Sequence, residues 1–373
     1  MNKSMGNYKY ISVYVRNKNI TPSSYYRITQ YIKNIDRCIL VRELAPDWIY
    51  IKQLNGNKNN ILSRVIIGIL YYCIIVSRCL YFLIYDYIKQ PSTIVVSKTF
   101  CPKYTPIVIR KLIKIVSAKS NIYWDFDDNI FESREISEKQ AKILEEYSYG
   151  IVVTNNFLKS QISDKYRGKV KLLPTTDGDL QGFDDVDLLN SRLNTFENEF
   201  RIIWVATSGN IPHLEKVISA IDDAGEIINN KRVILTIVCN KSFNYKANNI
   251  IIRNVLWSRE VAKEEMYRSH VGIMPLIKND FTLGKGGFKL VQYISTGLPI
   301  IASKVGFNEE VVNEKCGILV EDEGNTKGWI EAIVDLSNSM DDWIEYSKSA
   351  YLNWNKKFPY EKNLIYWKNI LEK

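Results

Sequence analysis

Short apolar runs alternate with amphipathic stretches through the first half of the chain. Residues 10–15, 93–97 and 122–124 are apolar and rich in β-branched or aromatic side chains. A Pro-Ser-Ser loop and then an amphipathic stretch beginning near Tyr25 follow the first run, and a basic amphipathic stretch occupies residues 105–116. Such runs indicate strands, whereas apolar positions that recur every three or four residues indicate helices. Their alternation predicts a Rossmann-like half with a parallel sheet.

The same alternation returns in the second half, after a polar and acidic segment at residues 180–200 that has no sustained strand pattern. Residues 201–205, 233–239 and 271–276 predict strands, and residues 213–224 predict a helix. A chain of 373 residues is longer than one hydrophobic core usually supports. We therefore predict an α/β protein with two doubly wound domains and a boundary in the polar segment. No internal sequence repeat accompanies the two halves.

Residues 284–320 carry the strongest indication of chemistry, with the sequence GKGGFKLVQYISTGLPIIASKVGFNEEVVNEKCGILV. Gly284, Gly286 and Gly287 allow a backbone to come close to a ligand. The pattern predicts a glycine-rich loop, a helix that Gly297 ends, a buried strand, and a second loop that starts another helix. This order builds a crevice that can bind phosphate.

Two lysines and two helix starts in this segment suit a diphosphate. Lys285 and Lys289 are four residues apart and can project from one face of a helix towards an anion. A lysine at a helix start is unfavourable unless an anion compensates for the positive end of the helix dipole. Gly306 and Asn308 open the second helix, whose N–H groups can face the same anion. The alternative is that both lysines are solvated loop residues.

The segment resembles the nucleotide-sugar half of GT-B glycosyltransferases, and most closely glycosyltransferase family 4. Four motifs carry the resemblance: KLVQYISTGLPIIAS at residues 289–303, PSSYYRITQYI at 22–32, IYWDFDDNIF at 122–131 and IVVTNNFLKSQI at 151–162. They occur in the family's order and extend over nearly the whole chain. The resemblance implies two Rossmann-like domains that face each other across a cleft.

The same resemblance implies a division of labour and a reaction. Residues 1–180 would form the acceptor-side domain, joined by a terminal helix at about 357–373 that crosses back, and residues 181–356 would bind the nucleotide sugar. The enzyme would transfer a sugar, with retention of configuration, from a nucleoside-diphosphate sugar to a glycan or polyprenyl-linked acceptor, without a metal or other cofactor. The implied setting is bacterial surface-polysaccharide assembly, such as O-antigen or capsule.

Two residues depart from the family pattern. The family's two glutamates, separated by seven residues, fall here on Gly284 and Gln292. An amide both donates and accepts hydrogen bonds, so Gln292 can still bind a ribose hydroxyl. The first carboxylate is absent, and Asp280, just upstream on the same loop, is a candidate substitute.

The remaining donor-site candidates follow from the resemblance. Lys289 matches the family motif directly, and it would stabilise the leaving diphosphate together with Lys285 and the backbone at Gly286 and Gly287. Ser208 and Gly209 belong to the loop at 206–211, which the resemblance places near the donor phosphates. Glu310 either contacts the donor or is only an acidic residue in the first turn of a helix.

The carboxylates of the YWDFDDN motif are the acceptor-side candidates. Asp125, Asp127 and Asp128 follow a strand and could bind a metal, orient a sugar hydroxyl or act as a base. Because GT-B enzymes hold the diphosphate with protein cations, we assign no metal and interpret the motif as acceptor-side, with Asp127 and Asp128 as catalytic candidates. The alternative is a cap at a strand end. Arg27 is a further acceptor-side candidate.

Both histidines lie in the second half, although many family members place a catalytic-site histidine in the first domain. His213 stands at a predicted helix start beside the expected cleft and can contact a ligand. His270 precedes a predicted strand and is expected to be structural.

Residues 61–88 are the most apolar stretch of the chain. Arg64, Arg78 and Asp86 interrupt it, and the uncharged run from Val65 to Ser77 is 13 residues long, short of the roughly 20 that cross a bilayer. Two interpretations stay open: a buried helix over the first sheet, or a helix in the membrane interface. Nearby basic residues would support docking to anionic lipid at the inner face of a bacterial membrane; they are Lys98, Lys103, Arg110, Lys111 and Lys114.

Composition adds the setting. The chain has 50 lysines and arginines against 41 aspartates and glutamates, a net charge of +9, which favours anionic ligands or surfaces. The six cysteines lack zinc or redox spacing, and the N-terminal segment MNKSMGNYKYISVYVR lacks the apolar core of a signal peptide, so a cytoplasmic location is expected. Nucleic-acid binding fits the charge but not the motifs. A nucleotide-sugar 2-epimerase and a non-catalytic glycan-binding or membrane-binding relative remain alternatives.

Overall fold

The computed structural model describes residues 10–55, 61–180, 186–313, 315–321 and 325–372. The chain forms two units: unit 1 is Met1–Thr175 with Glu361–Lys373, and unit 2 is Thr176–Tyr360. This division lies a few residues before the predicted one. Most of the N-terminal segment considered as a signal peptide, residues 1–9, is outside the described residues.

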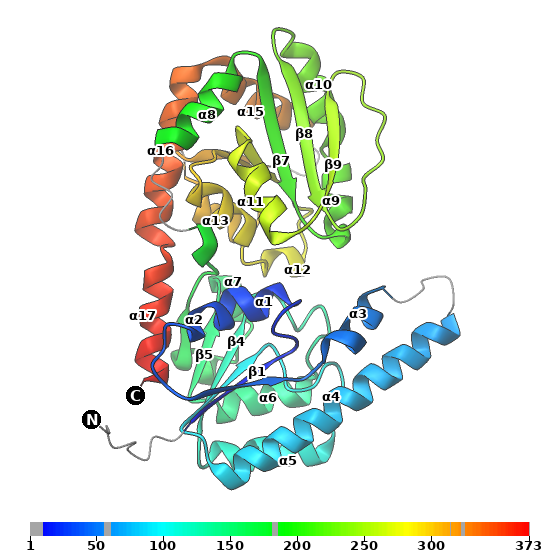
Figure 1. The fold of residues 1–373 in the computed structure, drawn as a ribbon, viewed down its shortest axis with the longest axis vertical. Coiled ribbons are helices and arrows are strands. Elements are labelled where there is room, and N and C mark those ends of the chain that lie inside the picture. The colour runs from blue at the N-terminus through cyan, green and yellow to red at the C-terminus, as the bar shows by residue number, and fades with distance from the viewer. Residues whose placement is uncertain (1–9, 56–60, 181–185, 314, 322–324, 373) are drawn as a thin grey trace, which may run out of the picture. The chain divides into compact units, whose positions relative to one another are not determined.

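Unit 1 is built on a parallel sheet in the order β2-β1-β3-β4-β5-β6 (Figure 1). Its strands are β1 (Ile11–Val15), β2 (Ile39–Glu43), β3 (Thr93–Ser97), β4 (Asn121–Phe126), β5 (Gly150–Val153) and β6 (Val170–Leu172). Its helices are α1 (Pro22–Ser24), α2 (Gln30–Ile32), α3 (Asp47–Asn55), α4 (Ile61–Lys89), α5 (Ile107–Ser117), α6 (Glu138–Tyr147), α7 (Asn156–Ser160) and most of α17 (Tyr360–Leu371). Every residue of β1 and β3 is buried, as expected for parallel strands covered on both faces.

Unit 2 repeats the architecture with a parallel sheet in the order β12-β11-β10-β7-β8-β9. Its strands are β7 (Glu199–Val205), β8 (Arg232–Cys239), β9 (Ile251–Leu256), β10 (Val271–Met274), β11 (Ile300–Ser303) and β12 (Gly317–Val320). Its helices are α8 (Val186–Phe196), α9 (Ile211–Glu215), α10 (Ile218–Ile227), α11 (Arg259–Tyr267), α12 (Asp280–Leu283), α13 (Phe288–Ser295), α14 (Asn308–Val311), α15 (Thr326–Asn338) and α16 (Met340–Lys357). The predicted α/β class with two Rossmann-like sheets is confirmed.

Each sheet changes winding direction once. In unit 1 the chain runs from β1 outward to β2 and then to β3 on the other side of β1; in unit 2 it runs from β7 to β8 and β9 and then to β10 on the other side of β7. Ligands of doubly wound sheets bind at such a switch point, beyond the carboxyl ends of the strands. In unit 2 the loops after β7 and β10 therefore flank the expected ligand position.

Several sequence-based expectations need correction. The Pro-Ser-Ser segment is not a loop, because Pro22–Ser24 begins a helix that continues as a π-helical turn at Tyr25–Thr29. The polar segment at residues 180–200 belongs to unit 2 and contains α8, whose apolar positions are too few to stand out among its polar residues. Strand β9 was missed because its residues are largely exposed and because Arg253 and Asn254 interrupt its apolar residues.

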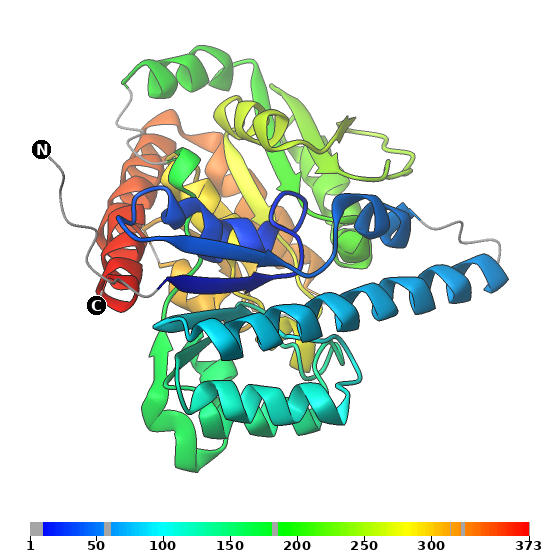
Figure 2. The same ribbon diagram turned by 60° about the horizontal axis from the view of Figure 1, so that its bottom comes forward.

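Helix α4 is exposed along most of its length. Only Ile75, Cys79, Leu83 and Asp86 are buried, a single narrow stripe. The N-terminal half extends beyond the sheet of unit 1 in both views (Figures 1 and 2). The structure therefore contradicts a mostly buried core helix. By length and composition α4 could also cross a membrane.

The C-terminal half of α4 is anchored to unit 1 by a buried polar cluster. The Asp86 carboxylate accepts hydrogen bonds from Tyr10 at 2.9 Å, from Tyr14 at 2.7 Å and from Arg42 at 2.8 Å. A buried carboxylate with these partners needs the protein around it, because leaving any of them unpaired is costly. This half of the helix is thus held by protein rather than by lipid.

Candidate functional site

The loop after β7 lies beside the switch point of unit 2. Asn240, which follows β8, holds this loop: its Oδ1 accepts from the Ser208 backbone N–H at 2.7 Å, and its Nδ2 donates to Ser208 Oγ at 3.3 Å. Gly209 is exposed, and a Cβ at this position would meet no atom within 4 Å. Ser208 and Gly209 therefore form a fixed turn that leaves room for an additional group.

Lys285 connects the loop after β10 to the loop after β7. Its Nζ donates to Asn210 Oδ1, and it lies 5.5 Å from the centre of the Phe281 ring. His213, on α9, accepts a hydrogen bond at Nδ1 from the Ile277 backbone N–H at 3.1 Å. Burial, helped by the charge of Lys285, lowers the pKa of His213 to about 4. His213 is thus a neutral acceptor near neutral pH, and Lys285 provides positive charge across the switch point.

The glycines of the crevice segment bring two loops into contact. Gly287 has a φ of +58°, and a Cβ there would come within 2.8 Å of the Phe307 ring. Gly306 has a φ of +57°, and a Cβ there would lie 2.7 Å from the Leu283 carbonyl oxygen. Both positions need glycine for backbone conformation and for packing between the loops. The expected close approach of backbone to ligand at Gly286 and Gly287 stays a prediction.

Lys289, on the first turn of α13, begins a chain of hydrogen bonds. Its Nζ donates to Gln292 Oε1 at 2.8 Å, and Gln292 Nε2 donates to Asp177 Oδ2 at 2.6 Å. Asp177 Oδ1 accepts from the Asp179 backbone N–H at 2.9 Å. Asp177 and Gln292 are almost fully buried, so this carboxylate, amide and ammonium form one connected group at the start of α13.

Burial shifts both charged ends of this group. It lowers the pKa of Lys289 to about 8, and Asp177 acts in the opposite direction. It raises the pKa of Asp177, while hydrogen bonds from Gln292 and Asp179 oppose the shift. Lys289 is therefore a desolvated cation that loses its proton in the mildly alkaline range.

The other donor-site candidates lie on exposed first turns. Asp280 is exposed at the start of α12, next to Asn279, which caps that helix together with Thr282. Glu310 is exposed on α14. Asn308 does not cap α14 as expected, because its Nδ2 donates to the Ser303 carbonyl at 2.9 Å instead. Their contact with a donor stays a prediction.

In unit 1, Arg27 and Asp125 pair with each other in the interior. The Arg27 guanidinium contacts Asp125 Oδ1 at 2.5 Å and also donates to the Leu173 carbonyl. Both residues are almost fully buried. Burial raises the pKa of Asp125, and the guanidinium acts against this shift. The pair joins the π-helical turn to the end of β4, and an acceptor role for either residue stays a prediction.

Asp127 and Asp128 gather around Lys98, which follows the neighbouring strand β3. Lys98 Nζ lies 3.1 Å from Asp127 Oδ1, 3.0 Å from Asp128 Oδ2 and 4.0 Å from Glu135 Oε2. Burial would raise the pKa of Asp127, but Lys98, Arg27 and Ser23 together hold it below its ordinary value. Asp127 therefore stays ionised, which suits an orienting acceptor better than a general base.

The sequence did not predict that Lys98 would lie among three carboxylates. It has a φ of +62° and a side chain that is 14% exposed. Its pKa is raised well above the ordinary value, because the three carboxylates outweigh the effect of burial. The expectation that Lys98 helps to bind lipid is wrong, since its ammonium is occupied inside unit 1.

His270 is buried and structural in its contacts, as expected. Its Nδ1 accepts from the Arg201 backbone N–H at 3.0 Å, and burial lowers its pKa to about 3. It lies among the aromatic rings of Phe196, Phe200 and Trp343.

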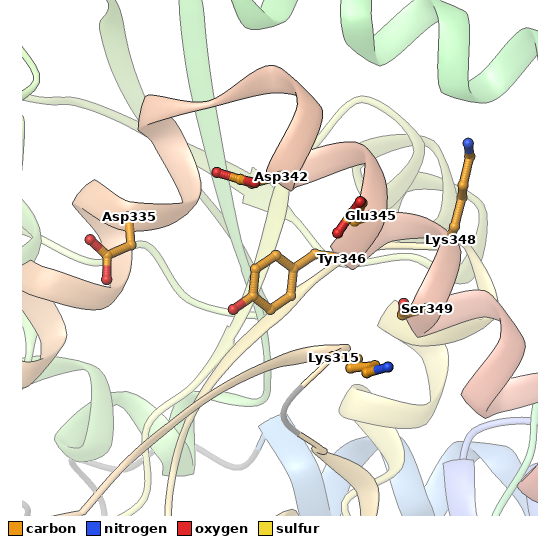
Figure 3. Close-up of a pocket in the computed structure, with 7 residues that line it drawn as sticks. All are labelled: Lys315, Asp335, Asp342, Glu345, Tyr346, Lys348 and Ser349. Atoms are coloured by element: carbon orange, nitrogen blue, oxygen red, sulfur yellow. The ribbon is translucent and has the colours of Figure 1, made fainter.

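A hollow elsewhere in unit 2 contains none of the predicted donor residues. It lies at α15, α16 and the residue before Cys316, and its lining is drawn in Figure 3: Lys315, Asp335, Asp342, Glu345, Tyr346, Lys348 and Ser349. Within the described residues, no group of three His, Cys, Asp or Glu side chains is arranged to hold a metal ion. The candidate site therefore consists of the charged and polar residues at the carboxyl edges of the two sheets, and not of the residues that line this hollow.

Sequence reasoning missed Asp177, and it did not predict the contacts that Asn210 and Lys98 make at these edges. Each is polar and stands in a loop after a strand, but its role depends on a hydrogen bond to a residue far along the chain. Only Asp177 had a local signal, since the Pro-Thr-Thr-Asp-Gly segment is typical of a tight connection.

Comparisons with known proteins agree with this geometry. A family model described as "Glycosyl transferases group 1" matches residues 201–339, which contain Lys285, Lys289 and Gln292 but not Asp177. HepE (Alr3699) of Anabaena, solved with UDP and glucose, has a TM-score of 0.66 at 12% identity and covers 98% of this chain and 100% of HepE. A search of curated proteins finds no match.

Two further structures show the same likeness over both units. Sucrose-phosphate synthase of Thermosynechococcus elongatus has a TM-score of 0.62 at 10% identity, with 97% of this chain and 98% of that chain covered. A glycosyltransferase of Rickettsia africae ESF-5 has a TM-score of 0.62 at 11% identity, with 98% of each chain covered. The chain therefore has the GT-B fold, and the match over residues 201–339 supports a glycosyltransferase of the group 1 type.

Proposed function

We propose that the chain transfers a sugar from a nucleoside-diphosphate sugar to a glycan or lipid-linked glycan acceptor, with retention of anomeric configuration. One observation carries the proposal. Lys285 and Lys289 lie at the carboxyl edge of the unit 2 sheet, within the segment that matches group 1 glycosyltransferases, next to its switch point. HepE, which shares the fold, was solved with UDP-glucose.

The two lysines and the start of α13 would bind the diphosphate, with Gly286, Gly287, Ser208 and Gly209 giving the backbone room. In the reaction the bond between the anomeric carbon and the β-phosphate oxygen breaks, and that oxygen keeps the electron pair. Positive charge fixed in a partly dry site stabilises the developing anion without reorganising. Asp280 and Glu310 are the candidates for contacts with the sugar, and Gln292 for contact with the ribose.

The acceptor hydroxyl forms the new bond to the anomeric carbon, and its proton leaves with the diphosphate. Asp127 or Asp128 would orient that hydroxyl by accepting its hydrogen bond. The ion pairs to Lys98 fix both carboxylates and help to keep Asp127 ionised, which supports an orienting role. A role in bacterial O-antigen or capsule assembly in the cytoplasm fits a lipid-linked acceptor.

A screen of nucleotide sugars tests the activity. The purified chain is incubated with labelled UDP-, GDP-, dTDP- and CMP-sugars, with and without a polyprenyl-diphosphate glycan, and thermal stabilisation identifies the donor. Transfer of label to the acceptor is the expected result. An epimerised donor without transfer would instead identify the epimerase alternative, and stabilisation by no nucleotide sugar would identify the non-catalytic one.

We also propose that α4 attaches unit 1 to anionic membrane lipid. The exposed apolar side chains on its N-terminal half include Ile61, Leu62, Val65, Ile66, Ile69 and Leu70. Exposed Ile107, Val108 and Ile115 add to them on the adjacent α5, where Lys111 and Lys114 are also exposed. Apolar side chains interleaved with cations are typical of a helix that lies in the headgroup region.

Replacing Ile66 and Ile69 with Asp is expected to reduce vesicle binding more than tenfold, because each buried aliphatic side chain contributes about 1.5–3 kcal/mol. The measurement is cosedimentation with phosphatidylcholine vesicles that contain or lack phosphatidylglycerol. Leu256→Asp, at an apolar position in unit 2 that is more exposed than either isoleucine, is the control and should bind as the unchanged chain does. Undiminished binding of the double variant would rule out α4 as the attachment site.

A further inference from the structure

Asp177 is a buried carboxylate that none of the sequence patterns identified. It lies before the segment that matches group 1 glycosyltransferases, and the residue is 2% exposed. A carboxylate taken out of water is costly unless it is hydrogen-bonded and its charge is compensated. Two of its partners, the Gln292 amide and the Asp179 backbone N–H, are neutral donors. The compensating charge is that of Lys289, one amide further along the chain of hydrogen bonds.

The orientation of the Gln292 amide follows from these contacts. Its NH₂ group faces Asp177 and its carbonyl oxygen faces Lys289, which is the arrangement that satisfies both neighbours. A neutral amide in place of the Asp177 carboxylate can donate as well as accept, so it would no longer require this orientation. The carbonyl that now accepts from Lys289 could then turn away.

Gln292 occupies the position at which the resemblance places a glutamate. A carboxylate at that position would lie directly beside the Lys289 ammonium. Here the carboxylate comes instead from the segment that opens unit 2, and the amide transmits its influence. We propose that Asp177 is a positioning residue, which orients Gln292 and supplies the counter-charge that keeps Lys289 ready for the donor diphosphate. The part of this proposal that concerns the donor diphosphate rests on the proposed function, whereas the effect of Asp177 on Lys289 does not.

Further titratable groups act on this chain of hydrogen bonds. Asp179 lies two residues from Asp177 and also raises its pKa. Tyr267, at the end of α11, is raised in pKa mainly by burial and also by Asp177 and Asp179. Asp177 is the charged group that supports the protonated form of Lys289 against burial.

The first test needs no ligand. Lysine Cε resonances of the full chain, labelled with ¹³C, are titrated, and Lys289 is assigned as the signal lost in Lys289→Arg. In Asp177→Asn the Lys289 midpoint is expected to fall by about one pH unit, since a nearby opposite charge shifts a pKa by roughly 1–3 units and here acts through an amide. An unchanged midpoint would overturn the proposal, whatever the chain binds.

Two further variants separate charge from structure. Asp179→Asn removes the same charge from an exposed side chain of the same loop and should leave the Lys289 midpoint within about 0.3 units. The exchange variant Asp177→Asn/Gln292→Glu restores a carboxylate to the group and places it directly against Lys289, so the midpoint should rise above that of the unchanged chain. If Asp177→Asn unfolds, the exchange variant becomes the test of the proposal. A Lys289 midpoint that does not rise in that variant would contradict the proposal.

The second test uses inorganic pyrophosphate and UDP as probes. Asp177→Asn should weaken both about tenfold at pH 8.5 and much less at pH 6.5, because only at the higher pH does the variant lose the Lys289 charge. Equal weakening at both pH values would indicate a merely structural role. Failure of the unchanged chain to bind either probe would count against the proposed function, while the lysine titration would still judge the role of Asp177.

Discussion

Replacing Lys289 with alanine is expected to weaken binding of the nucleoside-diphosphate donor by about 30- to 150-fold. A hydrogen bond to a charged group contributes about 1.5–3 kcal/mol, and every 1.4 kcal/mol is a factor of ten in affinity. The loss should lie at the upper end of that range because Lys289 is partly buried, so that water cannot replace it fully. Isothermal titration with the nucleotide found in the screen measures the effect.

A lysine on a neighbouring loop provides the matched control. Lys304 follows β11, is exposed, and pairs with Glu321 at 2.5 Å. Lys304→Ala should change donor affinity less than twofold. The Lys304 ammonium is exposed and already paired with Glu321, and an exposed ion pair contributes at most about 1 kcal/mol. Unaltered donor binding in Lys289→Ala would remove the central assignment of the site.

The pH profile gives an independent signature of the same contact. The pKa of Lys289 in the free protein is about 8, so the ammonium is present below that pH and is lost above it. Donor affinity should therefore be level between pH 6 and 7.5 and fall tenfold per unit well above pH 8. Lys289→Arg keeps its charge to far higher pH, and its profile should stay level.

The fold could be predicted for those elements whose burial produces a clear apolar pattern in the sequence. Strand β3 and strand β11 are buried along their whole length, and short runs of β-branched and other small or apolar residues identify them. The edge strand β9 is largely exposed, and Arg253 and Asn254 interrupt its apolar residues, so its sequence carries a weaker signal. For helix α4 two interpretations stayed open, because apolar sequence alone does not tell a buried helix from an exposed one.

The site could be predicted only as far as local sequence reaches. The glycine-rich loop, α13 and the two lysines follow from spacing within one segment. The partner of Lys285 and the carboxylate that holds Gln292 do not, because Asn210 lies 75 residues from Lys285 and Asp177 lies 115 residues from Gln292. The glycines show the same limit: the sequence explains their conformation, but only the structure shows that Gly306 faces the Leu283 backbone.

The strongest effect on stability is expected at the buried pair of unit 1. Arg27→Met should destabilise unit 1 by about 3–5 kcal/mol, because it leaves the Asp125 carboxylate buried without a counter-charge. Asp125→Leu should lower the stability of unit 1 by a similar amount, because it leaves the Arg27 guanidinium buried without a counter-charge. Hydrogen exchange of β4 peptides in increasing urea measures this loss within the unit that contains the pair.

The double variant Arg27→Met/Asp125→Leu should regain more than half of that stability, since it leaves no unpaired buried charge. It should not recover all of it, because the Leu173 carbonyl loses the hydrogen bond that Arg27 donates. Lys142→Met is the control: Lys142 and its partner Glu138 are both exposed, so the loss should stay below about 1 kcal/mol. Single variants that keep full stability yet lose transfer activity would instead place Arg27 and Asp125 at the acceptor.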